Sequence, residues 1–133
     1  MKNGIQTEAY FKVDSVNKVV VCIMKVDMQF FKIAAWSAVD KRWWSKKAPM
    51  VDSYGCFTVI AKARCNSTDT FDETLGKRIA ESRAKAKAFK ISTRVYACIK
   101  KGLHSFVEEV DGKMKACAYE EGVELNHVSN LVK

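Results

Sequence analysis

Apolar and polar residues alternate along the first half of the chain, in short runs separated by polar turns. Residues 9–13 and 18–26 are rich in β-branched and aromatic side chains, and the polar stretch DSVN lies between them, which predicts a β-hairpin. Residues 56–65 alternate again and predict a third, half-buried strand. Its expected inward positions are Phe57, Val59, Ala61 and Ala63.

Residues 28–50 give no single pattern, because partly alternating aromatic residues are followed by a basic stretch that ends near Pro49. A strand and a short helix both fit this segment. In KRWWSKK, two adjacent tryptophans lie among cations, as in surfaces on which nucleic-acid bases stack. The stretch is equally explained by one core tryptophan beside another that covers a loop, because adjacent strand residues point to opposite faces.

A helix is expected from about residue 72 to residue 91 or beyond. Thr70 or Asp72 can cap it, and acidic residues there suit the positive end of its dipole. On a helical wheel, one stripe is expected to face the sheet: Leu75, Ile79, Ser82, Ala86 and Phe89. A second row borders this stripe: Gly76, Arg83, Lys87, Lys90 and Arg94. This cationic row is either an ordinary solvated helix face or the wall of a groove.

The pattern stays helical over residues 93–121, with an expected break near Gly102 and a turn at residues 111–113. The expected core positions are Val95, Ile99, Phe106, Val107 and Val110. Residues 122–133 are left unassigned.

Strands precede helices along the chain, and this order predicts an α+β fold. We expect an N-terminal antiparallel β-sheet followed by packed C-terminal helices. The chain is expected to form a single domain over residues 1–133, strand-rich over 1–65 and helix-rich over 70–121.

The composition adds a bias towards anionic partners, because 23 Lys and Arg against 15 Asp and Glu give a formal net charge of +8. Neither a signal peptide nor a membrane-spanning stretch is recognisable, so a soluble, cytoplasmic protein without a membrane partner is expected. The five cysteines are scattered and odd in number, which predicts free thiols.

Residues with catalytic potential are sparse. His104 and His127 are the only histidines, and neither has a companion at metal-ligand spacing. Asp69, Asp72 and Glu73 are better explained as residues that start a helix than as an acid–base pair. We therefore expect a protein that is not an enzyme and that carries neither a cofactor nor a metal.

Residues 57–87 resemble the strand, polar loop and helix of the first family of Thoeris anti-defence proteins, which are small phage proteins that sequester a host immune signal. The match consists of Phe, a small residue and Cys, then Asp-x-Phe, then Gly-x-x-Ile-Ala-x-x-Arg-Ala. It covers roughly 30 of the 133 residues, and the stretches YFKVD and VVVCI agree with it loosely.

The resemblance implies a phage-encoded protein that binds a small cyclic nucleotide of the glycocyclic ADP-ribose type without cleaving it. Some members of the family also hold cyclic oligonucleotides. In the family, arginines one turn apart on the helix contact phosphates, an aromatic residue stacks on a base and a polar loop residue completes the site. The corresponding ligand-binding candidates here are Arg83 and Lys87 for the phosphates, Phe57 or Tyr54 for the base, Asn66 in the loop, and Lys90 further along the cationic row. Because a lysine replaces the second arginine, a point charge takes the place of a bidentate grip.

A homo-oligomer, dimer or higher, is expected, because a small protein encloses a ligand most easily between two subunits. We expect the small residues Gly76, Ala80, Ala84 and Ala88 to allow close approach of another chain. The alternative is a basic nucleic-acid-binding protein that uses KRWWSKK together with the cationic row. A third possibility is an inhibitor whose basic face covers an acidic protein.

Overall fold

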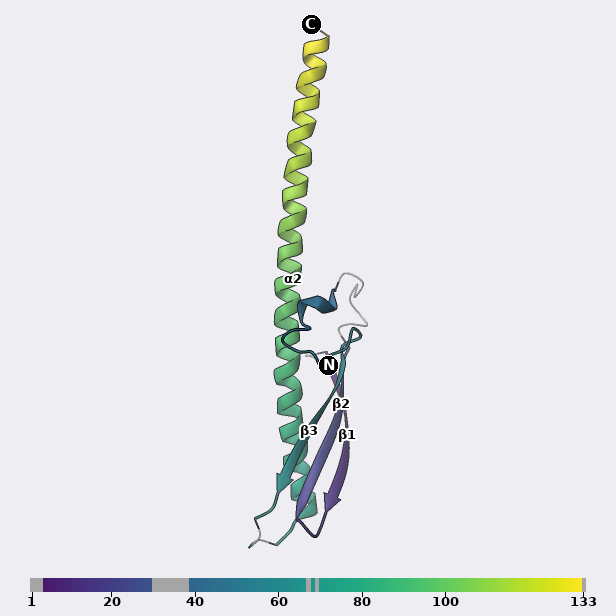
Figure 1. The fold of residues 1–133 in the computed structure, drawn as a ribbon, viewed down its shortest axis with the longest axis vertical. Helices are drawn as coiled ribbons and strands as arrows, with labels where there is room; N and C mark the ends of the chain where they lie inside the picture. The colour runs from purple at the N-terminus through teal and green to yellow at the C-terminus, as the bar shows by residue number, and fades with distance from the viewer. Residues whose placement is uncertain (1–3, 30–38, 67, 69, 133) are drawn as a thin grey trace. The chain divides into compact units, whose positions relative to one another are not determined.

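The computed structural model describes residues 4–29, 39–66, 68 and 70–132. By its internal contacts the chain divides into two compact units, Met1–Ile99 and Lys100–Lys133. The first unit holds a three-stranded sheet and the first part of a long helix, and the second unit holds the rest of that helix (Figure 1).

Strands β1 (Ile5–Asp14) and β2 (Val19–Met28) form the predicted hairpin. Strand β3 (Cys56–Arg64) pairs with β2, and both pairings are antiparallel, so the order in the sheet is β1-β2-β3. In the turn after β1, the Asp14 carboxylate accepts hydrogen bonds from the backbone N–H groups of Val16 and Asn17. The prediction of an N-terminal antiparallel sheet in an α+β fold is confirmed.

The alternation predicted for β3 is also confirmed. Every second residue of the strand is buried, beginning with Phe57 and ending with Ala63, and the residues between them are exposed. Residues of β2 that lie beside them on the same face, such as Met24 and Val26, are buried as well. One face of the sheet is therefore covered and forms the core of the first unit.

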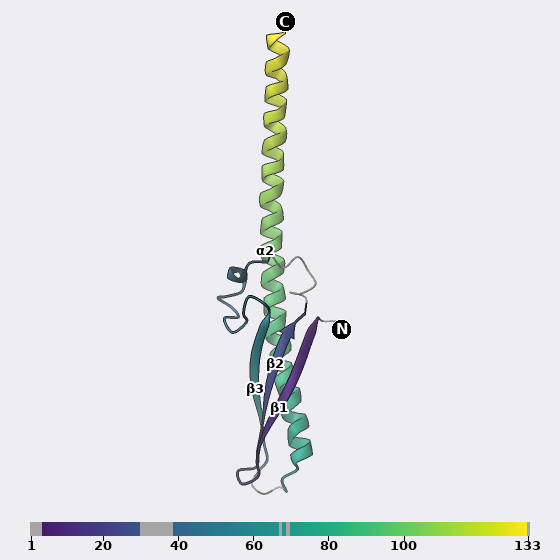
Figure 2. The ribbon, with the colours of Figure 1, turned by 90° about the vertical axis from the view of Figure 1, so that its right-hand side faces the viewer.

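Helix α2 (Glu73–Leu131) supplies the cover for that face (Figure 2). Its start agrees with the sequence, because the Asp72 carboxylate accepts a hydrogen bond of 3.0 Å from the Leu75 N–H group and so acts as the cap. The expected break near Gly102 and turn at residues 111–113 are wrong, and one helix takes the place of several. A glycine inside a helix costs only about 1 kcal/mol, which the good helix formers around it offset.

The predicted core stripe of this helix is wrong as well. Leu75, Ile79 and Phe89 are 51%, 37% and 41% exposed, and Ser82 and Ala86 are exposed too. The buried face is the nearly opposite one: Ala80, Ala84, Ala88, Ser92, Val95 and Ile99. Small side chains let the helix backbone approach the sheet closely, and larger ones would hold it away.

The small-residue face therefore packs on the sheet of its own chain, and the expectation that it approaches another chain is wrong. The helix also lies close to β2 at Gly76, where an added Cβ would lie 2.8 Å from Cγ2 of Val20. Val95 and Ile99, two of the predicted core positions, are buried as expected.

Replacing Gly76 by alanine is expected to lower the free energy of unfolding by about 1–2 kcal/mol, because the new methyl group overlaps the side chain of Val20. Gly112 is the matched control, since an added Cβ there meets nothing within 4 Å. Gly112→Ala is expected to stabilise the protein by about 0.5–1 kcal/mol. Urea unfolding of both variants measures these changes, and equal effects would contradict the close contact between helix and sheet.

The stretch before β3 packs on the same core. A 3-10 helix, η2 (Lys41–Trp43), is followed by Trp44, which is only 1% exposed and donates an Nε1–H hydrogen bond of 3.2 Å to the Val51 carbonyl. Trp43 is half-buried. The ambiguous segment 28–50 thus contains a short helix, and its residues 30–38 lie outside the described part of the chain.

In the second unit, residues 100–131 are helical throughout, beyond the predicted limit at residue 121. Phe106, Val107 and Val110, expected in a core, are exposed, because the described residues of this unit include no other element that could cover them. Within the described residues, no helix is both long and apolar enough to cross a membrane.

Candidate functional site

The cationic row of α2 lies along the free edge of β3. The guanidinium of Arg83 donates a hydrogen bond of 2.9 Å to the Lys62 carbonyl, and Nζ of Lys87 donates one of 2.7 Å to the Ile60 carbonyl. Strand β3 pairs with β2 on its other side only, so these carbonyls belong to an edge that no described strand covers.

These two contacts give the row a structural role. An open sheet edge presents unpaired carbonyl and N–H groups to any other strand, and proteins commonly protect such an edge with charged side chains. Arg83 and Lys87 do so at two alternate residues of β3, with one turn of helix between them. These two cations of the row are therefore engaged at the sheet edge and are not freely solvated.

A hollow opens where β3 ends and α2 begins, and we call it the β3–α2 hollow. It has a volume of about 460 Å³. Its lining consists of Ala63, Arg64, Cys65, Asn66, Thr70, Phe71, Asp72, Leu75, Gly76 and Ile79. Clefts that bind small molecules typically measure roughly 300–1,000 Å³ and combine an apolar lining with a few polar groups.

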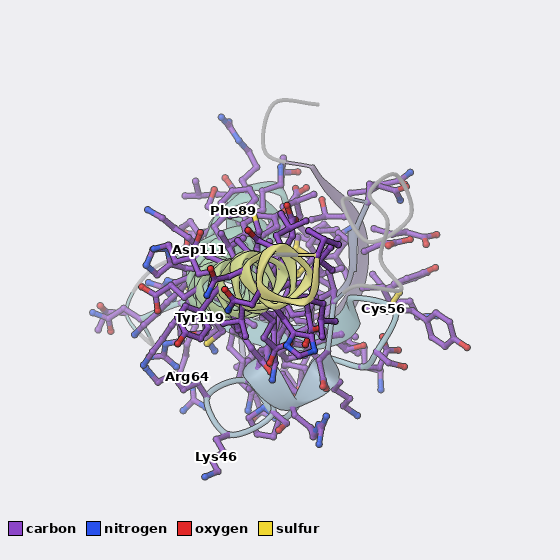
Figure 3. All side chains as sticks on the ribbon, turned by 90° about the horizontal axis from the view of Figure 1, so that it is seen from above. Lys46, Cys56, Arg64, Phe89, Asp111 and Tyr119 are labelled. Carbon is purple, nitrogen blue, oxygen red and sulfur yellow. The ribbon has the colours of Figure 1, made fainter. Side chains whose placement is uncertain are left out.

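The hollow combines the groups that a nucleotide requires. Leu75 and Ile79 supply apolar surface, Phe71 an aromatic ring, and Asn66 an amide. Its charged lining residues are Arg64, whose side chain projects away from the ribbon (Figure 3), and Asp72, whose carboxylate is already engaged as the helix cap. Arg83 is not a lining residue of the hollow: it follows Ile79 by one turn on the same side of α2, and its guanidinium donates to the Lys62 carbonyl.

A second hollow, of about 560 Å³, lies at the other end of β3. Its charged lining residues are the carboxylates of Glu8, Asp27 and Asp52 and the ammonium of Lys25. Three acidic groups against one basic group disfavour a phosphate. The β3–α2 hollow is therefore the better candidate for an anionic ligand.

The remaining predicted site residues do not gather at the β3–α2 hollow. Phe57 is only 6% exposed and packs in the core, so its ring does not offer a free face to a base. Tyr54 is 64% exposed in the turn before β3, and Lys90 is exposed on α2. Because Tyr54 and Asn66 lie beyond opposite ends of β3, which is about 30 Å long, one small nucleotide cannot contact both in a single chain.

The two tryptophans of KRWWSKK are not a pair of stacking surfaces. Trp44 is buried, which leaves the half-buried Trp43 beside exposed cations such as Lys46 (Figure 3). Arg42 forms a salt bridge with Asp40, with 2.7 Å between Nη2 and Oδ2, and hydrogen bonds from Arg42 lower the pKa of the Asp40 carboxyl. The interpretation with one core tryptophan is confirmed.

Sequence reasoning missed two residues of the hollow, Arg64 and Phe71. Arg64 is not one of the expected inward positions of β3, but its place at the end of the strand indicates that it can border a loop site. Phe71 belongs to the Asp-x-Phe part of the family pattern, yet it had no assigned role. Arg64 ends β3 and Phe71 lies in the polar connection that follows it, where binding residues are common.

No group of three or more His, Cys, Asp or Glu residues suited to a metal ion occurs among the described residues. In comparisons with known proteins, no protein-family model matches the chain, and no match appears among the curated proteins or the solved structures.

Proposed function

We propose that the protein binds a small cyclic nucleotide in the β3–α2 hollow and sequesters it without cleaving it, as a phage-encoded antagonist of a nucleotide immune signal in the cytoplasm of a host bacterium. The observation that supports the proposal is that Arg64, Asn66 and Phe71 line one hollow, with Arg83 one turn of α2 beyond its lining residue Ile79. The resemblance of residues 57–87 to Thoeris anti-defence proteins suggests the ligand class, a cyclic ADP-ribose isomer.

Each part of such a ligand meets a suitable group. The phosphates lie towards Arg64 and Arg83, because a guanidinium offers paired N–H donors to a phosphate. Phe71 stacks on the base, and Asn66 donates and accepts hydrogen bonds at its polar edge. Two charge-assisted contacts of about 1.5–3 kcal/mol each do not reach nanomolar affinity alone, so stacking and exclusion of water contribute the rest.

Nucleic acid is the second candidate ligand, since the net charge of +8 favours any polyanion. The burial of Trp44 removes one of the two stacking surfaces on which this alternative was based. A polymer-binding protein loses affinity steeply as salt rises and accepts long strands. A protein that sequesters one small ligand prefers that closed nucleotide over single- or double-stranded oligonucleotides at the same salt concentration.

Arg83→Gln is expected to weaken binding of a cyclic ADP-ribose isomer by roughly thirtyfold, because a charge-assisted phosphate contact is worth about 2 kcal/mol. Glutamine keeps an N–H donor for the Lys62 carbonyl, so the edge of β3 remains protected. Arg64→Ala is expected to cause a similar loss, and Lys87→Gln a smaller one, since a lysine is only a point charge.

Isothermal titration on variants with unchanged circular dichroism measures these losses. Lys46→Gln is the matched control: it removes one exposed cation from the loop before β3 and should leave the affinity unchanged. Wild-type affinity in both Arg83→Gln and Arg64→Ala would exclude the β3–α2 hollow as the binding site.

A further inference from the structure

The second unit carries an apolar stripe that no described residue of the same unit covers. Between residues 103 and 132, apolar residues follow one another at spacings of three, four and four residues, which is an 11-residue repeat. We call this set the C-terminal stripe: Leu103, Phe106, Val110, Met114, Cys117, Leu125, Val128 and Val132. The repeat has one acidic member, Glu121.

All members of the C-terminal stripe are exposed, and α2 is the only element among the described residues of this unit. A soluble helix normally buries such a stripe, because exposed apolar rows of this size mark interaction surfaces. The stripe extends for about 45 Å of helix, at 1.5 Å per residue. This length and regularity match a helical partner with the same repeat.

We propose that the C-terminal stripe is a homodimer interface in which the same segment of a second copy packs antiparallel to it. The charges select this partner and this direction. Lys113 flanks the stripe before its midpoint; after the midpoint, Glu121 is the acidic member of the repeat and Glu124 flanks the stripe. In an antiparallel pair, Lys113 of each copy lies opposite the turn of the other copy that carries the two glutamates, whereas a parallel pair would set like charges against each other.

The antiparallel arrangement also matches side chains along the stripe. With Cys117 facing its own copy at the two-fold axis, members of the stripe meet in the pairs Leu103–Val132, Phe106–Val128 and Val110–Leu125. The interface is then self-complementary and closed, so it produces a dimer and not a fibre. Acidic residues near the midpoint make an anionic membrane surface a poor alternative cover.

The oligomeric state of the full-length protein tests the proposal. Analytical ultracentrifugation is expected to give a dimer at micromolar concentration, and Val110→Asp is expected to raise the dimer dissociation constant by about a hundredfold or more, because each dimer would then bury two charges. Tyr119→Asp is the matched control, since Tyr119 is exposed on the opposite side of α2 and should leave the dimer intact. A monomer at about 100 μM, or equal effects of the two variants, would overturn the interface.

Cross-linking tests the direction. In a Cys117→Ser background, Leu103→Cys and Val132→Cys variants are mixed, oxidised and mapped by mass spectrometry. The antiparallel pair predicts disulfides between position 103 of one copy and position 132 of the other. Links of position 103 to position 103 would show a parallel pair and overturn the proposal, as would the absence of any link between copies at these positions.

Discussion

Trp44→Ala is expected to lower the free energy of unfolding by about 3–5 kcal/mol, the largest effect of any substitution considered for this protein. Trp44 is among the largest fully buried side chains, and its Nε1–H group is hydrogen-bonded to the Val51 carbonyl. Truncation leaves a cavity between the loop and the core and an unpaired acceptor at Val51. Guanidinium unfolding followed by circular dichroism measures the loss.

Trp43→Ala is the control for this prediction, because Trp43 is the neighbouring residue and is only half-buried. It is expected to cost about 1 kcal/mol, in proportion to the smaller apolar area that it removes from water. A larger loss for Trp43→Ala than for Trp44→Ala would mean that the loop packs with the other tryptophan inside.

Ala84→Leu is expected to destabilise the protein by about 3 kcal/mol, because Ala84 is fully buried where α2 packs on the sheet. The larger side chain would force the helix away from the strands. Ala86→Leu introduces the same change on an exposed position of the same helix and is expected to be nearly neutral. If the face predicted from the sequence were buried, Ala86→Leu would be the more destabilising change. Thermal unfolding of this pair therefore decides which face of the helix is inside.

The strands could be predicted from the sequence because alternation with a period of two determines both that a segment is a strand and which of its faces is buried. In β3, Phe57 and Val59 on one face and Thr58 and Lys62 on the other leave no doubt about which side is buried. The turn DSVN and the Asp72 cap follow from equally local chemistry. Each of these elements is determined by residues within a few positions of one another.

The buried face of α2 could not be predicted, because it depends on a distant element. Leu75, Ile79 and Phe89 form a good apolar stripe by themselves, and only the sheet makes the alanine face preferable. The continuity of the helix through Gly102 and Gly112 depends similarly on small energy differences.

Part of the candidate site was visible in the sequence. Arg83, Lys87 and Asn66 were recognised from charge spacing and from the family pattern. Their arrangement in space could not be predicted. The contacts of Arg83 and Lys87 depend on which edge of the sheet is free. The β3–α2 hollow forms only when Arg64 and Phe71 come together. The end of a strand and the start of a helix do not belong to one periodic pattern, so the sequence does not show that residues from the two places lie together.

Native mass spectrometry of the protein mixed with a cyclic ADP-ribose isomer tests the proposed function most directly. The account predicts a mass increase equal to the intact ligand in the wild-type protein, strong loss of this species in Arg64→Ala, and recovery of the unchanged cyclic nucleotide after heat denaturation. A wild-type protein that stays free of ligand, or a linear product that accumulates with turnover, would contradict it.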